Sequence, residues 1–300
     1  LAFAFYYQAI RPWVMNDEPT TLTWILALLG FALLFPMYMR FPDSWAPALR
    51  WGLRIGGWAG AVALLALIPY PGGRGISLWR SDIIIILLAW AYFGAALIWL
   101  FTRERPWLRL GLLVILFGLK MSSDAPGWIH EFWSWTPAPW VFHFGYFSYL
   151  FLVVPATLIG DRLVEWLESP DISSAPQPAA AWSRERLWGL AGLALAIHVV
   201  LLVGLQARWV FAATAASFAL MALGAWMTRA AAAPRDQWLR NLYLWGTFWL
   251  IVGLCFEPYQ GGIKKDGPTV SYFFVTCGSA IYLLIALTAV IDILRVERPF

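Results

Sequence analysis

Long apolar runs separated by short polar connections dominate this sequence. A helix needs about 20 largely apolar residues to cross a bilayer. By that measure the sequence predicts nine spans after an opening segment, Leu1–Ile10, which we interpret as the remnant of a helix with sequence missing upstream. The predicted spans are Leu22–Met39, Leu49–Tyr70, Ile83–Phe101, Trp107–Leu119, Val141–Ile159, Leu187–Gln206, Trp209–Thr228, Leu239–Phe256 and Ser271–Leu294.

The composition supports the same fold class. Hydrophobic residues make up 61% of the chain and charged residues only 13%, whereas soluble domains carry roughly 25% charged residues. With a mean hydropathy of +0.67, the chain has too few charges to cover a surface in water. We therefore predict an all-α fold, a polytopic transmembrane helix bundle.

The basic residues are divided unequally between the two ends of the predicted spans. Fourteen Lys and Arg fall around 40–54, 102–109, 160–186 and 229–240 and in the C-terminal segment, and seven fall in the other connections. Cytoplasmic loops are enriched in Lys and Arg, so this bias predicts a cytoplasmic C-terminus. It also explains the net charge of +4 without a nucleic-acid partner.

The chain is predicted to form a single membrane domain over residues 1–300. Residues 169–183 are rich in Pro, Ser and Ala, a composition typical of flexible linkers. This predicted cytoplasmic linker joins a helix group at 1–168 to a second group at 184–300. A transporter built on inverted repeats is not indicated, because the sequence shows no repeat of fixed period.

The loop at 256–268 carries the densest set of polar groups, and the predicted topology makes it exoplasmic. Its Gly261-Gly262 pair permits positive φ angles, and its polar residues form a candidate substrate-binding set: Glu257, Gln260, Lys264, Lys265 and Asp266. A carboxylate there could orient a sugar hydroxyl or an amine, and a lysine could hold an anion. The alternative interpretation is a solvated turn with its charges at the level of the lipid headgroups.

Other candidates are weaker. Arg80 and Asp82, on the same predicted side, either bind substrate or cap the third span. His130 is a candidate catalytic base or an interfacial side chain in a Trp-rich segment, and His198 is expected to bond to a neighbouring helix. The spacing of the three His predicts no metal site. The arginines at 50, 54, 103, 105 and 109 either bind the phosphates of a nucleotide-like donor or simply follow the positive-inside rule.

Three phrases carry a resemblance to a known family. They are Leu78–Ile85, Tyr149–Asp161, and Gly261–Asp266 with Thr269–Thr276. Together they resemble a bacterial membrane family related to the heparan-α-glucosaminide N-acetyltransferases, over about 21–294. The resemblance implies a multi-pass acyltransferase of the bacterial cytoplasmic membrane, with acyl-CoA as co-substrate. It also implies a catalytic His in an exoplasmic loop near the N-terminus, but the opening loop Arg11–Pro19 contains no His.

Two functions therefore stand as expectations. The first is transfer of an acyl group from acyl-CoA to a sugar or glycan acceptor on the exoplasmic side, with the catalytic residue unknown. The second is a non-catalytic accessory subunit of a larger membrane complex. Its aromatic helices would pack against partner subunits, lipids or pigments. In both cases membrane lipids are expected partners.

Overall fold

The computed structural model of the chain describes residues 2–15, 18–67, 75–77, 79–80, 83–168 and 181–293. Every regular element within these ranges is a helix, which confirms the predicted all-α class. Several predictions lie outside the described residues: Asp82, most of the linker at 169–183, and the ends of two spans at Tyr70 and Leu294. The chain divides into two compact units, Leu1–Ala91 with Ser123–Phe147, and Tyr92–Ser122 with Ser148–Phe300. The helix groups predicted at 1–168 and 184–300 stay a prediction.

The first unit is built on a pair of long helices. α3 (Thr21–Tyr38) begins with a capping box at Thr20 and packs against α4 (Pro47–Leu67). The opening segment is helical through α1 (Ala2–Phe5), η1 (Tyr6–Ile10) and α2 (Arg11–Val14), and it buries Ile10 and Trp13 in the same core. α7 (Trp128–Trp133) and the first part of α5 (Ile83–Thr102) complete the unit.

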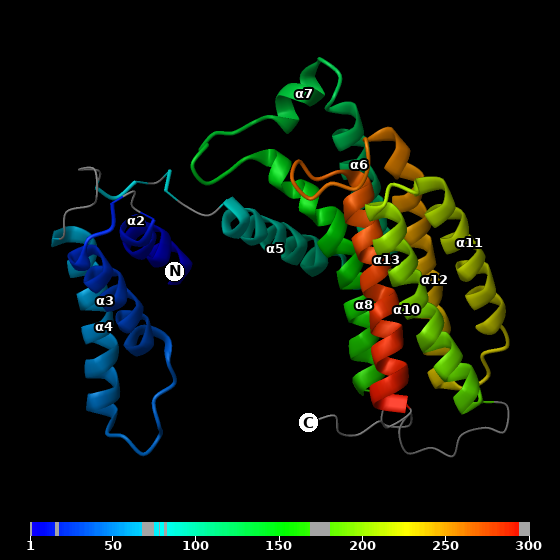
Figure 1. The fold of residues 1–300 in the computed structure, drawn as a ribbon, viewed down its shortest axis with the longest axis horizontal. Helices are drawn as coiled ribbons and strands as arrows, with labels where there is room; N and C mark the ends of the chain where they lie inside the picture. The colour runs from blue at the N-terminus through cyan, green and yellow to red at the C-terminus, as the bar shows by residue number, and fades with distance from the viewer. Residues whose placement is uncertain are drawn as a thin grey trace. The chain divides into compact units, whose positions relative to one another are not determined.

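The second unit is a larger bundle (Figure 1). Its members are the rest of α5, α6 (Pro106–Ser122), α8 (Leu150–Glu168), α10 (Arg184–Gln206), α11 (Val210–Met227), α12 (Pro234–Phe256), α13 (Val270–Leu287) and η5 (Thr288–Ile293); η3 (Phe144–Tyr149) leads into α8. The pair α12 and α13 packs most closely. A Cβ added to Gly278 would lie 2.7 Å from the backbone N of Leu250, the kind of approach that small residues permit between membrane helices.

Seven helical segments among the described residues are long and apolar enough to cross a membrane. They are Thr21–Tyr38, Ile83–Thr102, Phe144–Glu168, Arg184–Gln206, Val210–Met227, Pro234–Tyr259 and Val270–Ile291. This is the architecture of an integral membrane helix bundle. The nine predicted spans are not confirmed, because α4 and α6 do not join this set; α6 has only 17 residues.

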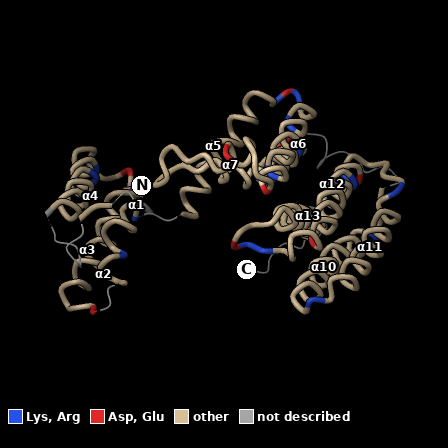
Figure 2. Tube along the Cα trace, turned by 90° about the horizontal axis from the view of Figure 1, so that it is seen from above, with Lys and Arg blue, Asp and Glu red and all other residues tan. Residues whose placement is uncertain are grey.

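Charged residues occupy short stretches of the trace, mostly in connections and near helix ends (Figure 2). This distribution is expected where helix sides face hydrocarbon, since a charge there is costly. Arg109 is an exception. It belongs to α6 and its side chain is wholly buried.

Candidate functional site

The predicted loop connects the ends of α12 and α13 within the second unit. It begins with the short helix η4 (Glu257–Tyr259). Gly261, Gly262 and Gly267 have φ angles of +68°, +102° and +68°, a region that favours glycine. The predicted positive φ of the Gly-Gly pair is therefore confirmed, and the loop is a defined turn.

Several polar groups of the loop brace the turn. Gln260 accepts a hydrogen bond from the backbone N–H of Val270 at 2.6 Å, at the first residue of α13. Thr269, the N-cap of α13, accepts from the Tyr272 N–H at 3.3 Å. The Thr269 hydroxyl also donates to the carbonyl of Gly262 at 3.2 Å. Gln260 thus has a local structural role.

The charged groups of the loop lie in two environments. Lys264, Lys265 and Asp266 are exposed. Glu257 is only 5% exposed, and Arg208 reaches the same point: a Cβ on Gly262 would lie 2.7 Å from Arg208 Nη1 and 3.4 Å from Glu257 Oε1. The turn thus brings the Glu257 carboxylate and the Arg208 guanidinium close to Gly262. The substrate-binding role of the loop stays a prediction.

Arg80 and His130 belong to the first unit. Arg80 donates to the carbonyl of Gly75 at 3.2 Å, and its own carbonyl accepts from the Gln8 amide at 2.6 Å. His130 Nδ1 lies 2.7 Å from the Ser123 carbonyl oxygen. Both residues therefore hold local loop structure within the first unit.

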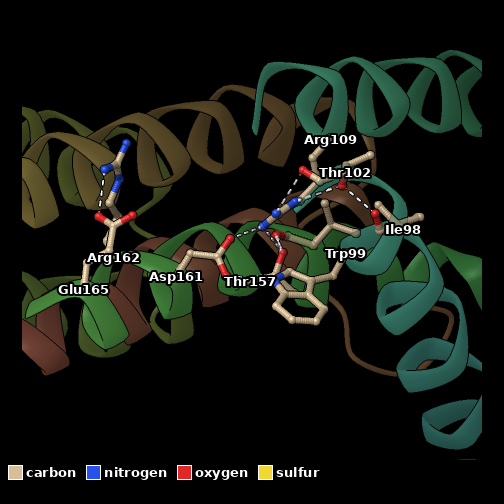
Figure 3. Close-up of polar contacts among 9 residues, drawn as sticks. Ile98, Trp99, Thr102, Arg109, Thr157, Asp161, Arg162 and Glu165 are labelled. Carbon is tan, nitrogen blue, oxygen red and sulfur yellow. Dashed lines mark hydrogen bonds and ion pairs between the residues drawn. The ribbon is translucent and has the colours of Figure 1, made fainter. Parts of the chain in front are cut away.

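A buried guanidinium is the centre of a hydrogen-bond network in the second unit. Arg109 lies near the start of α6 and has no exposed side-chain surface. Its Nη1 donates to Asp161 Oδ2 at 2.7 Å and to Thr157 Oγ1 at 3.0 Å, both on α8. Its Nε donates to Thr102 Oγ1 at 3.2 Å, at the end of α5 (Figure 3). A buried charge needs such a full set of partners.

The aromatic side chain of Trp99 extends this network. Its indole N–H donates to Asp161 Oδ1 at 2.7 Å, so each carboxylate oxygen of Asp161 accepts a hydrogen bond (Figure 3). The guanidinium of Arg103 lies over the Trp99 ring, 5.4 Å from its centre, close enough for a cation–π contact. The network therefore fixes Asp161 and positions Arg103. Arg109 itself is unavailable to a phosphate, contrary to one interpretation of the sequence.

A charged pocket of about 530 Å³ lies beside this network. Its charged lining comes from α8 and from the turn between α5 and α6: Arg103, Glu104, Asp161, Arg162, Glu165 and Glu168. Asp161 is paired with Arg109, and Arg162 with Glu165 at 2.9 Å. Arg103, Glu104 and Glu168 form no ion pair among the described residues.

An apolar groove of about 540 Å³ adjoins the charged pocket. It is lined by α6, α12 and Phe274 of α13, and Asn241 is its one amide. Trp107, Leu110 and Trp245 line both cavities, so the two lie next to each other. The indole N–H of Trp249, a groove residue that is 4% exposed, has no hydrogen-bond partner among the described residues.

Residues 1–167 match the sequence model of a family described as "Domain of unknown function (DUF5009)". The chain belongs to this family. A search of curated proteins and a search of solved structures each returned no match. The description of the family states no activity.

The part of this DUF5009 chain that matches the family includes Arg109, Asp161 and Trp99, and thus the buried network. α12 and α13, which complete the groove, follow the matched part. In the ranges the structure describes, no group of three or more His, Cys, Asp or Glu is placed so that it could hold a metal ion. The sequence alone did not reveal the pocket, the groove or the partner of Arg109.

Proposed function

We propose that the chain takes part in acyl transfer at the membrane, with an amphiphile that carries a hydrocarbon chain held by its second unit. The observation that carries the proposal is that the apolar groove and the charged pocket share lining residues. An acyl chain fits the groove, because its lining is almost wholly apolar and can pack against hydrocarbon. The polar end of the same molecule then lies among the charges of the pocket.

The resemblance to membrane acyltransferases supports this function and supplies the reaction. In that reaction a hydroxyl or amine of the acceptor attacks the carbonyl of an acyl-CoA thioester, a base takes the acceptor's proton, and the CoA thiol leaves. The proposed acceptor is a sugar or glycan near the loop at 256–268. In the proposal this acceptor contacts three exposed side chains of the loop, Lys264, Lys265 and Asp266. The proposal assigns no catalytic base.

The proposal includes a topology of nine spans in a bacterial cytoplasmic membrane, with a cytoplasmic C-terminus. It is supported by α4, of 21 residues, and α6, of 17 residues, each lying in chain order between longer apolar helices. Alkaline phosphatase fusions test it. A fusion after Asp266 should be active and a fusion after Ala232 inactive; the reverse pattern would overturn the assigned orientation.

The experiment uses the full-length protein in proteoliposomes with radiolabelled acyl-CoA and a set of sugar acceptors. Val114 lines the groove and is 67% exposed, so Val114→Trp should fill the groove without disturbing the core. Leu195→Trp, at a 47% exposed position on α10 outside the groove, is the matched control. We expect transfer by wild type and by Leu195→Trp, and at least tenfold less by Val114→Trp. Absence of transfer by wild type would refute the proposed function.

A further inference from the structure

We propose that the charged pocket and the apolar groove together bind a zwitterionic aminophospholipid, such as phosphatidylethanolamine. Its phosphate contacts Arg103, its ammonium contacts Glu104 and Glu168, and one acyl chain lies in the groove. This binding goes beyond the proposed acyl transfer, whose donor is acyl-CoA, and it assigns the lipid no part in that reaction. The binding itself is measured without turnover.

The charges of the pocket select this headgroup. Asp161 is neutralised by Arg109 and Glu165 by Arg162. Arg103, Glu104 and Glu168 are then the charged lining side chains that form no ion pair with any described residue. One cation with two carboxylates complements a phosphate joined to an ammonium. The pocket does not complement acyl-CoA or an anionic phospholipid, because both bring negative charge and no cation to its carboxylates.

Along α12, the residue that borders the charged pocket precedes the unpaired indole N–H, as the phosphate of a phospholipid precedes its ester carbonyls. Trp245 lines both cavities, and Trp249 lies one helical turn farther into the groove, about 6 Å along the helix axis. The ester carbonyls of a phospholipid lie a few bonds below its phosphate. A carbonyl at this depth gives the indole N–H of Trp249 the acceptor that it lacks.

The length of the groove fits a single acyl chain. The groove follows α12 from Asn241 to Phe256 and shares Trp245 with the charged pocket. Beyond Trp245, as far as Phe256, the helix rises about 16 Å. This is about half the ~30 Å thickness of the hydrocarbon core, and therefore the depth of one leaflet. Trp107, Val114 and Leu244 on the rim of the groove are 80%, 67% and 50% exposed, so a lipid can enter from the side.

The test measures lipid binding to the full-length protein in detergent by native mass spectrometry. The probes are phosphatidylethanolamine, phosphatidylglycerol with the same chains, and palmitoyl-CoA. We expect phosphatidylethanolamine to bind about fivefold more tightly than phosphatidylglycerol, the difference expected of one favourable exposed ion pair. A diazirine on its acyl chain should crosslink to α6 and α12. Equal binding of the two lipids would mean a non-selective boundary lipid and would overturn the proposal, as would tighter binding of palmitoyl-CoA.

Variants separate the site from general lipid binding. Glu104→Gln with Glu168→Gln should remove the preference for phosphatidylethanolamine, and Glu131→Gln, an exposed residue of α7, should not. Trp249→Phe should weaken both phospholipids equally, since it removes the N–H and replaces the indole by a smaller aromatic ring. A preference that survives the double substitution would refute the proposal. Selective binding together with absence of acyl transfer would refute the proposed function alone.

Discussion

The buried Arg109–Asp161 pair and the exposed Arg162–Glu165 pair provide a test of what burial does to an ion pair. Both pairs involve α8, and their N–O distances are similar, 2.7 and 2.9 Å. The Arg109 side chain is completely buried and that of Asp161 is 32% exposed, whereas the second pair is 61% and 63% exposed. The perturbation is Asp161→Asn, with Glu165→Gln as the matched control; each replaces a carboxylate by an amide of the same shape.

The expected losses differ by several-fold. Asp161→Asn leaves the buried guanidinium of Arg109 without a counter-charge, and the single amide oxygen replaces two acceptors, so either Arg109 or Trp99 loses its hydrogen bond (Figure 3). Removing one partner of a buried pair costs about 3–5 kcal/mol, and the partial exposure of Asp161 places the expected loss of unfolding free energy near the lower end, about 3 kcal/mol. Glu165→Gln breaks an exposed (i, i+3) pair, so its expected cost is about 0.3–0.5 kcal/mol.

The assay is reversible unfolding of the purified protein in mixed detergent micelles, followed by the fluorescence of its 21 tryptophans and by circular dichroism. A third variant, Arg109→Met with Asp161→Leu, removes both charges. It should be more stable than Asp161→Asn, since replacing a buried pair by apolar side chains is often nearly neutral. Equal losses for Asp161→Asn and Glu165→Gln, or a double variant less stable than Asp161→Asn, would refute the reasoning.

Two further predictions concern glycines. Gly262→Ala should lower the unfolding free energy by about 2–3 kcal/mol, because φ is +102° and the new Cβ would lie 2.7 Å from the Arg208 guanidinium. Gly267→Ala should lower it by only about 1 kcal/mol, because φ is +68° and no atom lies within 4 Å of the new Cβ. Gly278→Ala should cost about 1–3 kcal/mol by overpacking α12 against α13, whereas Gly192→Ala, with no atom within 4 Å of the new Cβ, should stabilise α10 by about 0.5–1 kcal/mol. Thermal unfolding of the four variants in one detergent checks both orders; a reversed order within either pair contradicts the corresponding argument.

The fold class followed from the sequence because long apolar runs leave few alternatives to membrane helices. The number of spans did not follow in the same way. α4 carries Arg50 and Arg54 near its start, and α6 has only 17 residues. Such helices meet the length and hydropathy criteria only in part. Whether they cross the membrane depends on how far neighbouring helices shield their charged side chains from lipid, and the local sequence does not show this shielding.

The sequence predicted the local conformation and hydrogen bonding of several residues better than it predicted their function. The Gly261-Gly262 pair predicted positive φ, and both residues have it. His198 was expected to bond to a neighbouring helix, and its Nε2 lies 2.8 Å from the carbonyl oxygen of Ser279 on α13. Gln260 is a candidate binding residue whose side chain also accepts the backbone N–H of Val270 at the start of α13. An amide side chain serves either purpose, and the sequence alone does not show the position of the Val270 N–H.

The sequence indicated that Arg109 needs a carboxylate partner but did not identify which one. Arg109 is the fourth residue of α6 and is followed by the apolar run Leu110–Leu119. An arginine at such a position is expected to find a carboxylate. The sequence offered several carboxylates on the same predicted side: Glu104, Asp161, Glu165 and Glu168. Asp161 is nearest the centre of α8 among its three acids and reaches the buried guanidinium, whereas Glu165, one turn farther along, pairs with Arg162. The choice between these acids depends on how far α6 and α8 overlap, and that overlap is set by tertiary packing and not by the local sequence.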